Sequence, residues 1–254
     1  MTDLSNWMMV FLRFGALLYL FPVLSSTQFP IRLRVGLAAL VAFLIAPTLP
    51  PPTSPVDEGF LSFASTMIRE VAVGMTMGFV SRLSFHVLEL CAGIVGMEIG
   101  LNVAASFNPL AETRTEAFGT ITFLLGAMLL FTLDLHHWML GAFQRSYGLV
   151  PVGRAGISMP LFYEVLYRTS QVFQAGLVMS APVLAISFLI SVTFAMISRA
   201  VPSMNVFSDS FSFRILAGML VFGFTLNLLA QHAANYLRRL PEDLLRVARL
   251  LSPT

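Results

Sequence analysis

The sequence predicts an all-α, polytopic integral membrane protein of about six to eight helical segments. Hydrophobic residues make up 57% of the chain, charged residues only 11%, and the mean hydropathy is +0.82. Soluble globular chains carry about 25% charged residues, so this composition indicates a membrane protein. Only helices and closed β-barrels satisfy the backbone in lipid, and no stretch shows the roughly ten-residue alternation of a barrel strand.

Seven predominantly apolar runs support this prediction, because a membrane span needs roughly 20 such residues. They are residues 7–24, 35–49, 60–80, 83–101, 117–133, 161–197 and 213–230. The first run contains Arg13, is preceded by Asp3 and has no small-residue cleavage site after it, so we expect a retained anchor rather than a cleaved signal peptide. The sixth run is long enough for two segments, and Pro182 is expected to kink it or divide it.

Proline-rich stretches mark the connections, most clearly at residues 47–55, where proline at that density cannot continue a helix. The last residues, 241–254, predict a short amphipathic helix that lies on a surface or binds a partner. Four apolar residues share its one side: Leu244, Leu245, Ala248 and Leu251. We expect residues 1–254 to form a single helical domain.

A stripe of polar residues and glycines runs along the fourth apolar run. Its members recur every three or four residues, as on one face of a helix: Arg82, His86, Glu89, Gly93, Gly96 and Gly100. Charged groups in a span, which here include Glu98, are expected to face protein or water. Glycines at this spacing, like Gly74 and Gly78 one run earlier, allow close helix packing. The stripe therefore predicts packing within the chain or contact with other subunits or a passage.

The stretch after this stripe, EIGLNVAASFNPLAETRTEAFG at residues 98–119, is not apolar. Asn108 and Pro109 are a strong turn signal, and Thr113 with Glu116 forms a capping box, so the next helix is expected to begin at Thr113. Irregular backbone at membrane depth is tolerated only inside protein or along a water-filled cavity. The segment is therefore expected to lie inside an assembly or pore, or else to emerge on a membrane surface as an ordinary connection.

Few residues could carry enzymatic chemistry. The sequence contains no nucleophile elbow, P-loop or dinucleotide fingerprint, and its single cysteine, Cys91, excludes an intramolecular disulfide. Asp134, His136 and His137 in LDLHHW could bind a metal, but adjacent histidines are expected to point to different faces. We interpret them, with Trp138, as a polar belt at the membrane surface. We predict no enzyme, no cofactor and no metal site, and the net charge of +2 does not suggest nucleic-acid binding.

Several blocks of sequence resemble one known family. In order they are RFGALLYLFPVLSS, PIRLRVGLA, REVAVGMTMGFV, AGIVGMEIGLNVAASFNP, LLFTLDLHHWMLGAFQRSYGLVPVG and RAVPSMNVFSDSFSFRILAG. In order and spacing they resemble the R-type inner-membrane subunit of the flagellar and type III secretion export apparatus, the FliR/SctT family. The most specific parts are residues 92–109 and 202–207, and the resemblance covers nearly the whole chain.

This resemblance implies a fold of helical hairpins wound into an export gate in the bacterial inner membrane, at the flagellar basal body or injectisome base. It implies P-type and Q-type partner subunits (FliP-like and FliQ-like), a B-type switch protein (FlhB-like) and an A-type export channel (FlhA-like). Exported unfolded proteins and membrane lipid are the other expected contacts. The implied function is a structural and gating subunit, with flagellar membership favoured over an injectisome.

The resemblance also assigns a plug loop, at about residues 103–118, that closes the pore before substrates pass. Its expected pore residues are Ala104, Ala105, Ser106, Phe107, Asn108, Pro109, Glu112 and Arg114. Asn108 stands where many family members have an acidic residue, so no carboxylate role carries over to that position. The alternative function is an ion-coupled secondary transporter that uses Arg82, His86 and Glu89 as intramembrane charges, with His86 and Glu89 as a proton relay.

Overall fold

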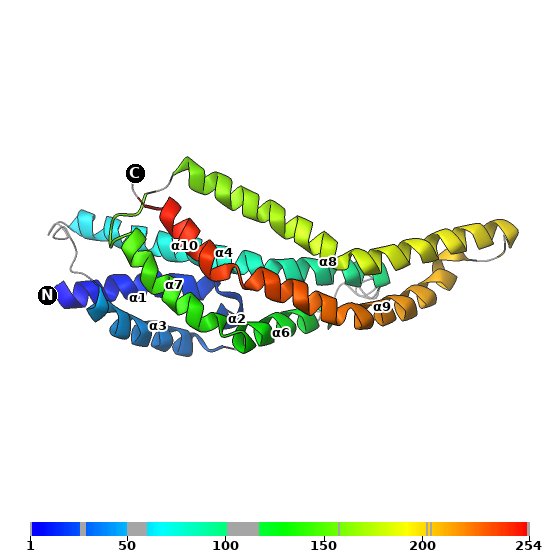
Figure 1. Cartoon of the computed structure of the whole chain (residues 1–254), viewed down its shortest axis with the longest axis horizontal. Coiled ribbons are helices and arrows are strands. Elements are labelled where there is room, and N and C mark those ends of the chain that lie inside the picture. The colour runs from blue at the N-terminus through cyan, green and yellow to red at the C-terminus, as the bar shows by residue number, and fades with distance from the viewer. Residues whose placement is uncertain are drawn as a thin grey trace. The chain divides into compact units, whose positions relative to one another are not determined.

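A computed structural model describes residues 2–25, 29–49, 60–100, 117–156, 158–201, 203 and 205–252, and this part of the chain is helical with no strand (Figure 1). The elements in order are α1 (Thr2–Leu20), α2 (Pro22–Ser25), α3 (Ile31–Ile45), the 3-10 turn η1 (Ala46–Thr48), α4 (Phe60–Ile99), α6 (Ala117–Thr132), α7 (Leu135–Leu149), α8 (Met159–Ala200), α9 (Val206–Leu237) and α10 (Leu240–Leu250). The prediction of an all-α, polytopic membrane protein is confirmed.

Four stretches of the described residues are long and apolar enough to cross a membrane: Ile31–Thr48, Phe60–Ile99, Met159–Ala200 and Asp209–Leu250. A fifth is added if α6 and α7, which are bent at the break between them, form one broken span. Of the four, α4 is the most enclosed by the rest of the chain. In its most apolar 18-residue segment 61% is buried, whereas the corresponding share in the other three is 28% or less. The other three therefore present most of their apolar surface outward.

The observed helices differ from the expected apolar runs in two places. Runs 60–80 and 83–101 form the single 40-residue helix α4, because Ser81 and Arg82 do not stop a helix. Run 161–197 is one 42-residue helix, α8, with Pro182 inside it. The division that was one of the two alternatives at Pro182 is therefore wrong, and the kink stays a prediction. Proline is tolerated inside membrane helices when neighbouring groups satisfy the freed carbonyl. At roughly 1.5 Å per residue, α4 and α8 are each about 60 Å long, twice the hydrocarbon core of about 30 Å.

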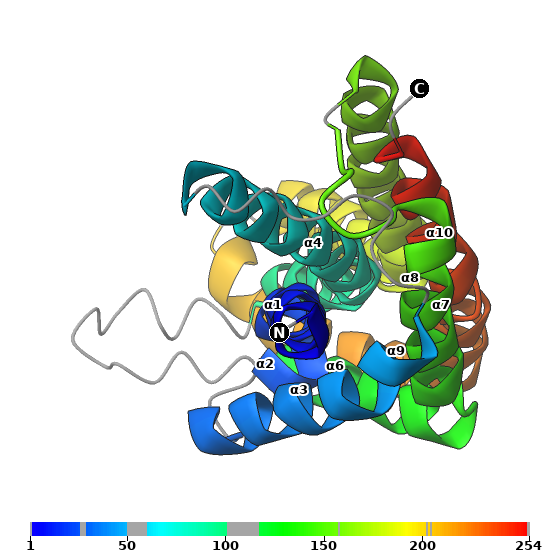
Figure 2. The ribbon, with the colours of Figure 1, turned by 90° about the vertical axis from the view of Figure 1, so that its left-hand side faces the viewer.

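The chain divides into two compact units. Unit 1 comprises Met1–Phe85, Leu130–Ser170 and Leu237–Thr254, and unit 2 comprises His86–Leu129 and Gln171–Tyr236. In unit 1, α1 lies along α3, where Trp7 Nε1 donates a hydrogen bond to the Ala39 carbonyl at 3.3 Å (Figure 2). Phe14 of α1 also packs on Phe143 of α7, with ring centroids 4.8 Å apart. Unit 1 therefore has its core between α1, the first part of α4 and α7.

Helix α10 uses its apolar face inside the chain. Leu240, Leu244, Val247 and Ala248 are buried, and α10 packs along α7 (Figure 1). Its end is held by hydrogen bonds from Ser158 Oγ to the Leu250 carbonyl at 2.8 Å and from the Gly156 amide to the Leu251 carbonyl at 3.0 Å. The amphipathic tail is therefore not a free surface helix, and the expectation of a surface-lying or partner-bound apolar face is wrong.

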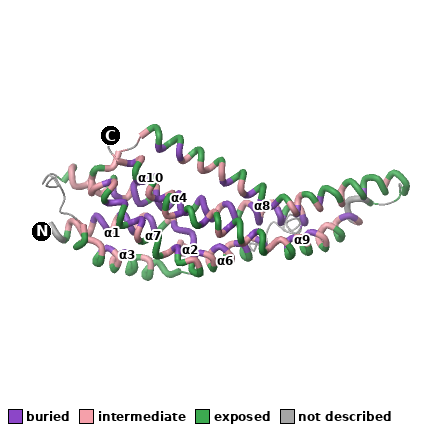
Figure 3. The backbone as a smooth tube through the Cα atoms, in the orientation of Figure 1, coloured by how far each residue is buried: buried purple, intermediate pink, exposed green. Residues whose placement is uncertain are grey.

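Unit 2 is built around the second part of α4. Its Val87, Leu88, Val95 and Ile99 are at most 1% exposed. Thr122 of α6 reaches the Leu88 carbonyl at 3.4 Å, and Phe118 of α6 packs edge-on to Phe222 of α9 with centroids 4.7 Å apart. The outward sides of α8 and α9 are exposed in this chain (Figure 3), and they carry large apolar side chains such as Phe188 and Phe224.

Candidate functional site

The expected plug loop lies mostly outside the described residues. This applies to all eight of its named pore residues: Ala104, Ala105, Ser106, Phe107, Asn108, Pro109, Glu112 and Arg114. The start of the next helix, expected at Thr113, is also outside them, and the described part of α6 begins at Ala117. The last two residues of the expected loop, Ala117 and Phe118, therefore lie in α6, where Phe118 is buried.

Gly74 and Gly78 lie where α4 passes closest to α1. A Cβ atom at Gly74 would overlap the Arg13 carbonyl oxygen and would lie 2.9 Å from the Ala16 Cβ. A Cβ atom at Gly78 would lie 2.8 Å from the Leu17 carbonyl oxygen. Both distances are too short for a side chain, so the two helices approach each other through these glycines.

The three glycines of the stripe have different surroundings. Gly93 is half-buried, and a Cβ atom there would meet no described atom within 4 Å other than those of its own helix and its chain neighbours. Gly96 is buried. Gly100 has a φ of +86° and its amide donates to the Met97 carbonyl at 3.1 Å, so it ends α4 in the left-handed conformation that glycine favours. A Cβ there would also lie 2.5 Å from the Phe211 ring of α9.

The ionisable residues of the stripe do not form a closed network. His86 and Glu89 pair with each other on α4, with Nδ1 and Oε2 2.5 Å apart, and their side chains are 37% and 46% exposed. Arg82 is exposed and Glu98 is half-buried. Among the described residues, no ion pair joins these four to another helix. The described chain therefore shows a local pair on an outward face rather than a relay between helices.

A buried ionic cluster in unit 1 connects α1, α4 and α7. Arg13 Nε donates to Glu70 Oε2 at 2.6 Å and Arg13 Nη2 donates to Glu70 Oε1 at 2.9 Å, and both side chains are fully buried. Arg13 also donates to the Val150 carbonyl at 3.1 Å, and its guanidinium lies 3.9 Å from the centroid of the Tyr147 ring. This bidentate pair is the geometry in which a buried arginine and carboxylate satisfy each other.

The same cluster fixes the connection after α7. The Gly153 amide donates to Glu70 Oε1 at 2.9 Å, and Arg69 Nη1 donates to the Gly153 carbonyl at 3.2 Å. Gly153 has a φ of +76° and lies against Thr66. The sequence marked Arg13 as a charge within an apolar run, but Glu70 was not among the expected site residues. The signal that could have found it is the same one, an ionisable residue inside an apolar run.

A second ionic cluster holds the beginning of α8 to α10. Arg168 lies 2.8 Å from Glu164 Oε1 and 2.7 Å from Asp243 Oδ2, and Arg246 lies 3.2 Å from Glu164 Oε1. Glu164 is 9% exposed in its side chain, so it is shared between two guanidinium groups in a mostly buried position. These pairs, with the apolar face of α10, fix the C-terminal helix within unit 1.

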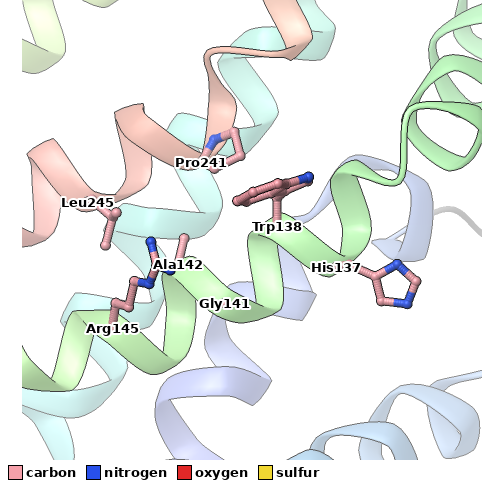
Figure 4. Close-up of a pocket in the computed structure, with 7 residues that line it drawn as sticks. All are labelled: His137, Trp138, Gly141, Ala142, Arg145, Pro241 and Leu245. Atoms are coloured by element: carbon pink, nitrogen blue, oxygen red, sulfur yellow. The ribbon is translucent and has the colours of Figure 1, made fainter.

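The turn between α6 and α7 brings together three possible metal ligands. Ligand atoms of Asp134, His136 and His137 all lie within 4.8 Å of one another, and the two imidazole rings are 4.0 Å apart at their centroids. The two imidazole rings are therefore close together, although adjacent residues of a helix are expected to point to different faces. Trp138 follows them in α7, and with His137, Arg145 and Leu245 it lines a pocket formed by α7 and α10 (Figure 4).

Comparison with known proteins gives a consistent result. A family model described as "Bacterial export proteins, family 1" matches residues 4–240. The flagellar biosynthetic protein FliR of Caulobacter vibrioides is 27% identical over 219 residues, which cover 86% of this chain and 87% of that protein. The FliR proteins of Pectobacterium carotovorum and Escherichia coli are 25% and 24% identical, over 92% and 82% of this chain and 90% and 79% of their own lengths.

Proposed function

Because the chain belongs to the bacterial export proteins of family 1, we propose that it is a structural and gating subunit of the inner-membrane export gate for type III protein secretion. The observation that carries the proposal is the family match over residues 4–240. Flagellar biosynthesis is the proposed setting, because the relatives are named flagellar biosynthetic proteins. The role is to pass unfolded proteins rather than to catalyse a reaction.

The lengths of the helices support a place inside an assembly. Exposed apolar side chains occur along α8 from Phe162 to Ile197. At roughly 1.5 Å per residue this apolar surface extends for about 50 Å, whereas the hydrocarbon core of a bilayer is about 30 Å thick. On an upright helix, lipid covers only part of an apolar surface of this length. Contact with other protein subunits would bury the part that extends beyond the hydrocarbon core.

The proposed partners are the P-type and Q-type gate subunits, the B-type switch protein and the A-type export channel. Exposed Arg82 and Glu89 and half-buried His86 suit such an environment, because a partner or water can solvate charges that lipid cannot. Residues 103–118, which follow α4 in the sequence and end at the start of α6, are proposed to plug the pore. Their polar members can be solvated by water when the loop is displaced, and their small members fit a narrow lumen.

Co-purification tests this function. The full chain is tagged in its own organism, extracted in mild detergent and analysed by mass spectrometry and by the mass of the intact complex. The expected result is a complex that contains the P-type and Q-type subunits, and loss of swimming and of filament-protein export when the gene is deleted. Restoring the untagged gene should restore both. Recovery of the chain without these subunits, together with normal swimming of the deletion strain, would refute the proposal.

A further inference from the structure

We propose that the turn between α6 and α7 binds a divalent transition-metal ion of the zinc class through Asp134, His136 and His137. The ligand atoms of the three residues already lie within 4.8 Å of one another. Neutral imidazole nitrogen and carboxylate oxygen are ligands that Zn²⁺, Ni²⁺ and Co²⁺ accept, whereas Mg²⁺ and Ca²⁺ prefer oxygen alone. Three protein ligands with a fourth position open to water is a common arrangement for zinc.

The backbone of this turn places the carboxylate beside the second histidine. Asp134 has a φ of +53°, and no other non-glycine residue in the described part of the chain has a positive φ. Asp134 precedes α7 at the position where an aspartate usually accepts a hydrogen bond from the helix, yet its side chain makes no such capping bond. Instead its Oδ1 lies 3.7 Å from His137 Nδ1. The carboxylate is therefore free of the capping role and directed toward an imidazole.

The first histidine has a nitrogen without a partner. His136 Nδ1 is shielded from solvent, and no hydrogen bond to it is formed by the described residues. An unsatisfied buried polar atom carries a free-energy penalty, so a partner from outside the described residues would stabilise this histidine. The His136 ring is held by its neighbours, since its centroid is 5.4 Å from that of Phe131 and 4.0 Å from that of His137.

The site is open to an incoming ion. The side chains of Asp134 and His137 are 72% and 70% exposed. The His137 ring points away from Pro241 and Leu245 of α10, although all three residues line one pocket (Figure 4). The bound ion would hold the left-handed turn at Asp134 and leave a coordination position for water. This inference does not depend on the proposed export function.

Metal titration of the purified full chain tests the site. The chain carries an affinity tag without histidine, is stripped with a chelator and is then equilibrated with Zn²⁺ or Co²⁺ alone. We expect one metal ion per chain by elemental analysis and visible d–d absorption bands with Co²⁺. Asp134→Asn keeps a residue that tolerates the left-handed backbone, and His137→Ala removes an exposed ring, so both variants should fold. Loss of a residue that only supports a ligand lowers metal affinity roughly tenfold or more. Because each variant removes a ligand itself, we expect each to lower the affinity for Zn²⁺ by at least about tenfold.

Two histidines elsewhere in the chain serve as matched controls. His86→Ala and His232→Ala should bind Zn²⁺ as the parent does, because neither residue belongs to the turn. The proposal is wrong if the parent binds less than one metal ion per chain. That result would instead favour the interpretation of these residues as a polar belt at the membrane surface. The proposal is also wrong if Asp134→Asn and His137→Ala bind as tightly as the parent, or if the controls lose binding equally.

Discussion

Arg13 and Glu70 show how two residues far apart in sequence determine the packing of three helices. Moving one charge into a low-dielectric interior costs several kcal/mol, so neither residue is tolerated there alone. Each satisfies the other through two hydrogen bonds, and the remaining donors and acceptors reach Val150 and Gly153. The pair therefore selects one arrangement of α1, α4 and the segment after α7, because any other register leaves a buried charge without its partner.

Removing one member of this pair should destabilise the protein. Glu70→Gln leaves the Arg13 guanidinium buried without a counter-charge, and we expect a loss of about 3 to 5 kcal/mol in the free energy of unfolding. The measurement is denaturant-induced unfolding of the detergent-solubilised chain, followed by circular dichroism. The matched control is Glu242→Gln on the exposed side of α10, which should change stability by less than about 0.5 kcal/mol.

A double variant separates loss of charge balance from loss of packing. Arg13→Leu with Glu70→Leu removes both charges together, so it should recover part of the stability lost in Glu70→Gln, because no unpaired charge remains. If Glu70→Gln unfolds at the same denaturant concentration as the Glu242→Gln control, the pair does not contribute as described.

At the scale of the helices, the contact between α1 and α4 depends on Gly74. Gly74→Ala places a methyl group on the Arg13 carbonyl, so the two helices must separate. We expect a loss of about 1 to 3 kcal/mol, the usual range for overpacking. Gly93→Ala on the same helix meets open space and should be neutral or stabilising by up to about 1 kcal/mol, because alanine favours helix. Thermal unfolding of both variants tests this, and equal melting temperatures would contradict the close approach at Gly74.

The same scale shows what could and could not be predicted from the sequence. Apolar runs located α1, α3, α8 and α9, because a helix in lipid needs a continuous apolar stretch. They did not show that α4 is one helix, since hydropathy measures apolar content and Ser81 with Arg82 lowers it without breaking the backbone. The amphipathic pattern of α10 was predicted, but a pattern of apolar residues does not name the surface that covers it, which here is α7.

Contacts between distant residues were the least predictable part of the site. Arg13 and Glu70 are 57 residues apart, and no spacing rule connects them. The three proposed ligands at the Asp134 turn are close in sequence, but Asp134 lies outside the helix in a left-handed conformation, whereas His136 and His137 belong to α7. Helical spacing therefore does not predict where the carboxylate lies relative to the two imidazoles. The plug residues were assigned by resemblance, and that assignment stays a prediction.

At the scale of the whole molecule, the proposed gate would have to remain closed to ions and still open to a substrate. If residues 103–118 plug the lumen, their hold must be modest, because a closure worth more than a few kcal/mol would not yield to differential binding of an arriving protein. Deleting residues 106–113 should therefore leave the complex assembled but leaky. The measurement is halide or dye uptake and growth rate on expression, with recovery of the P-type and Q-type subunits measured in the same strain so that a folding defect is distinguished. An assembled deletion complex as tight to ions as the parent would make this loop an ordinary connection.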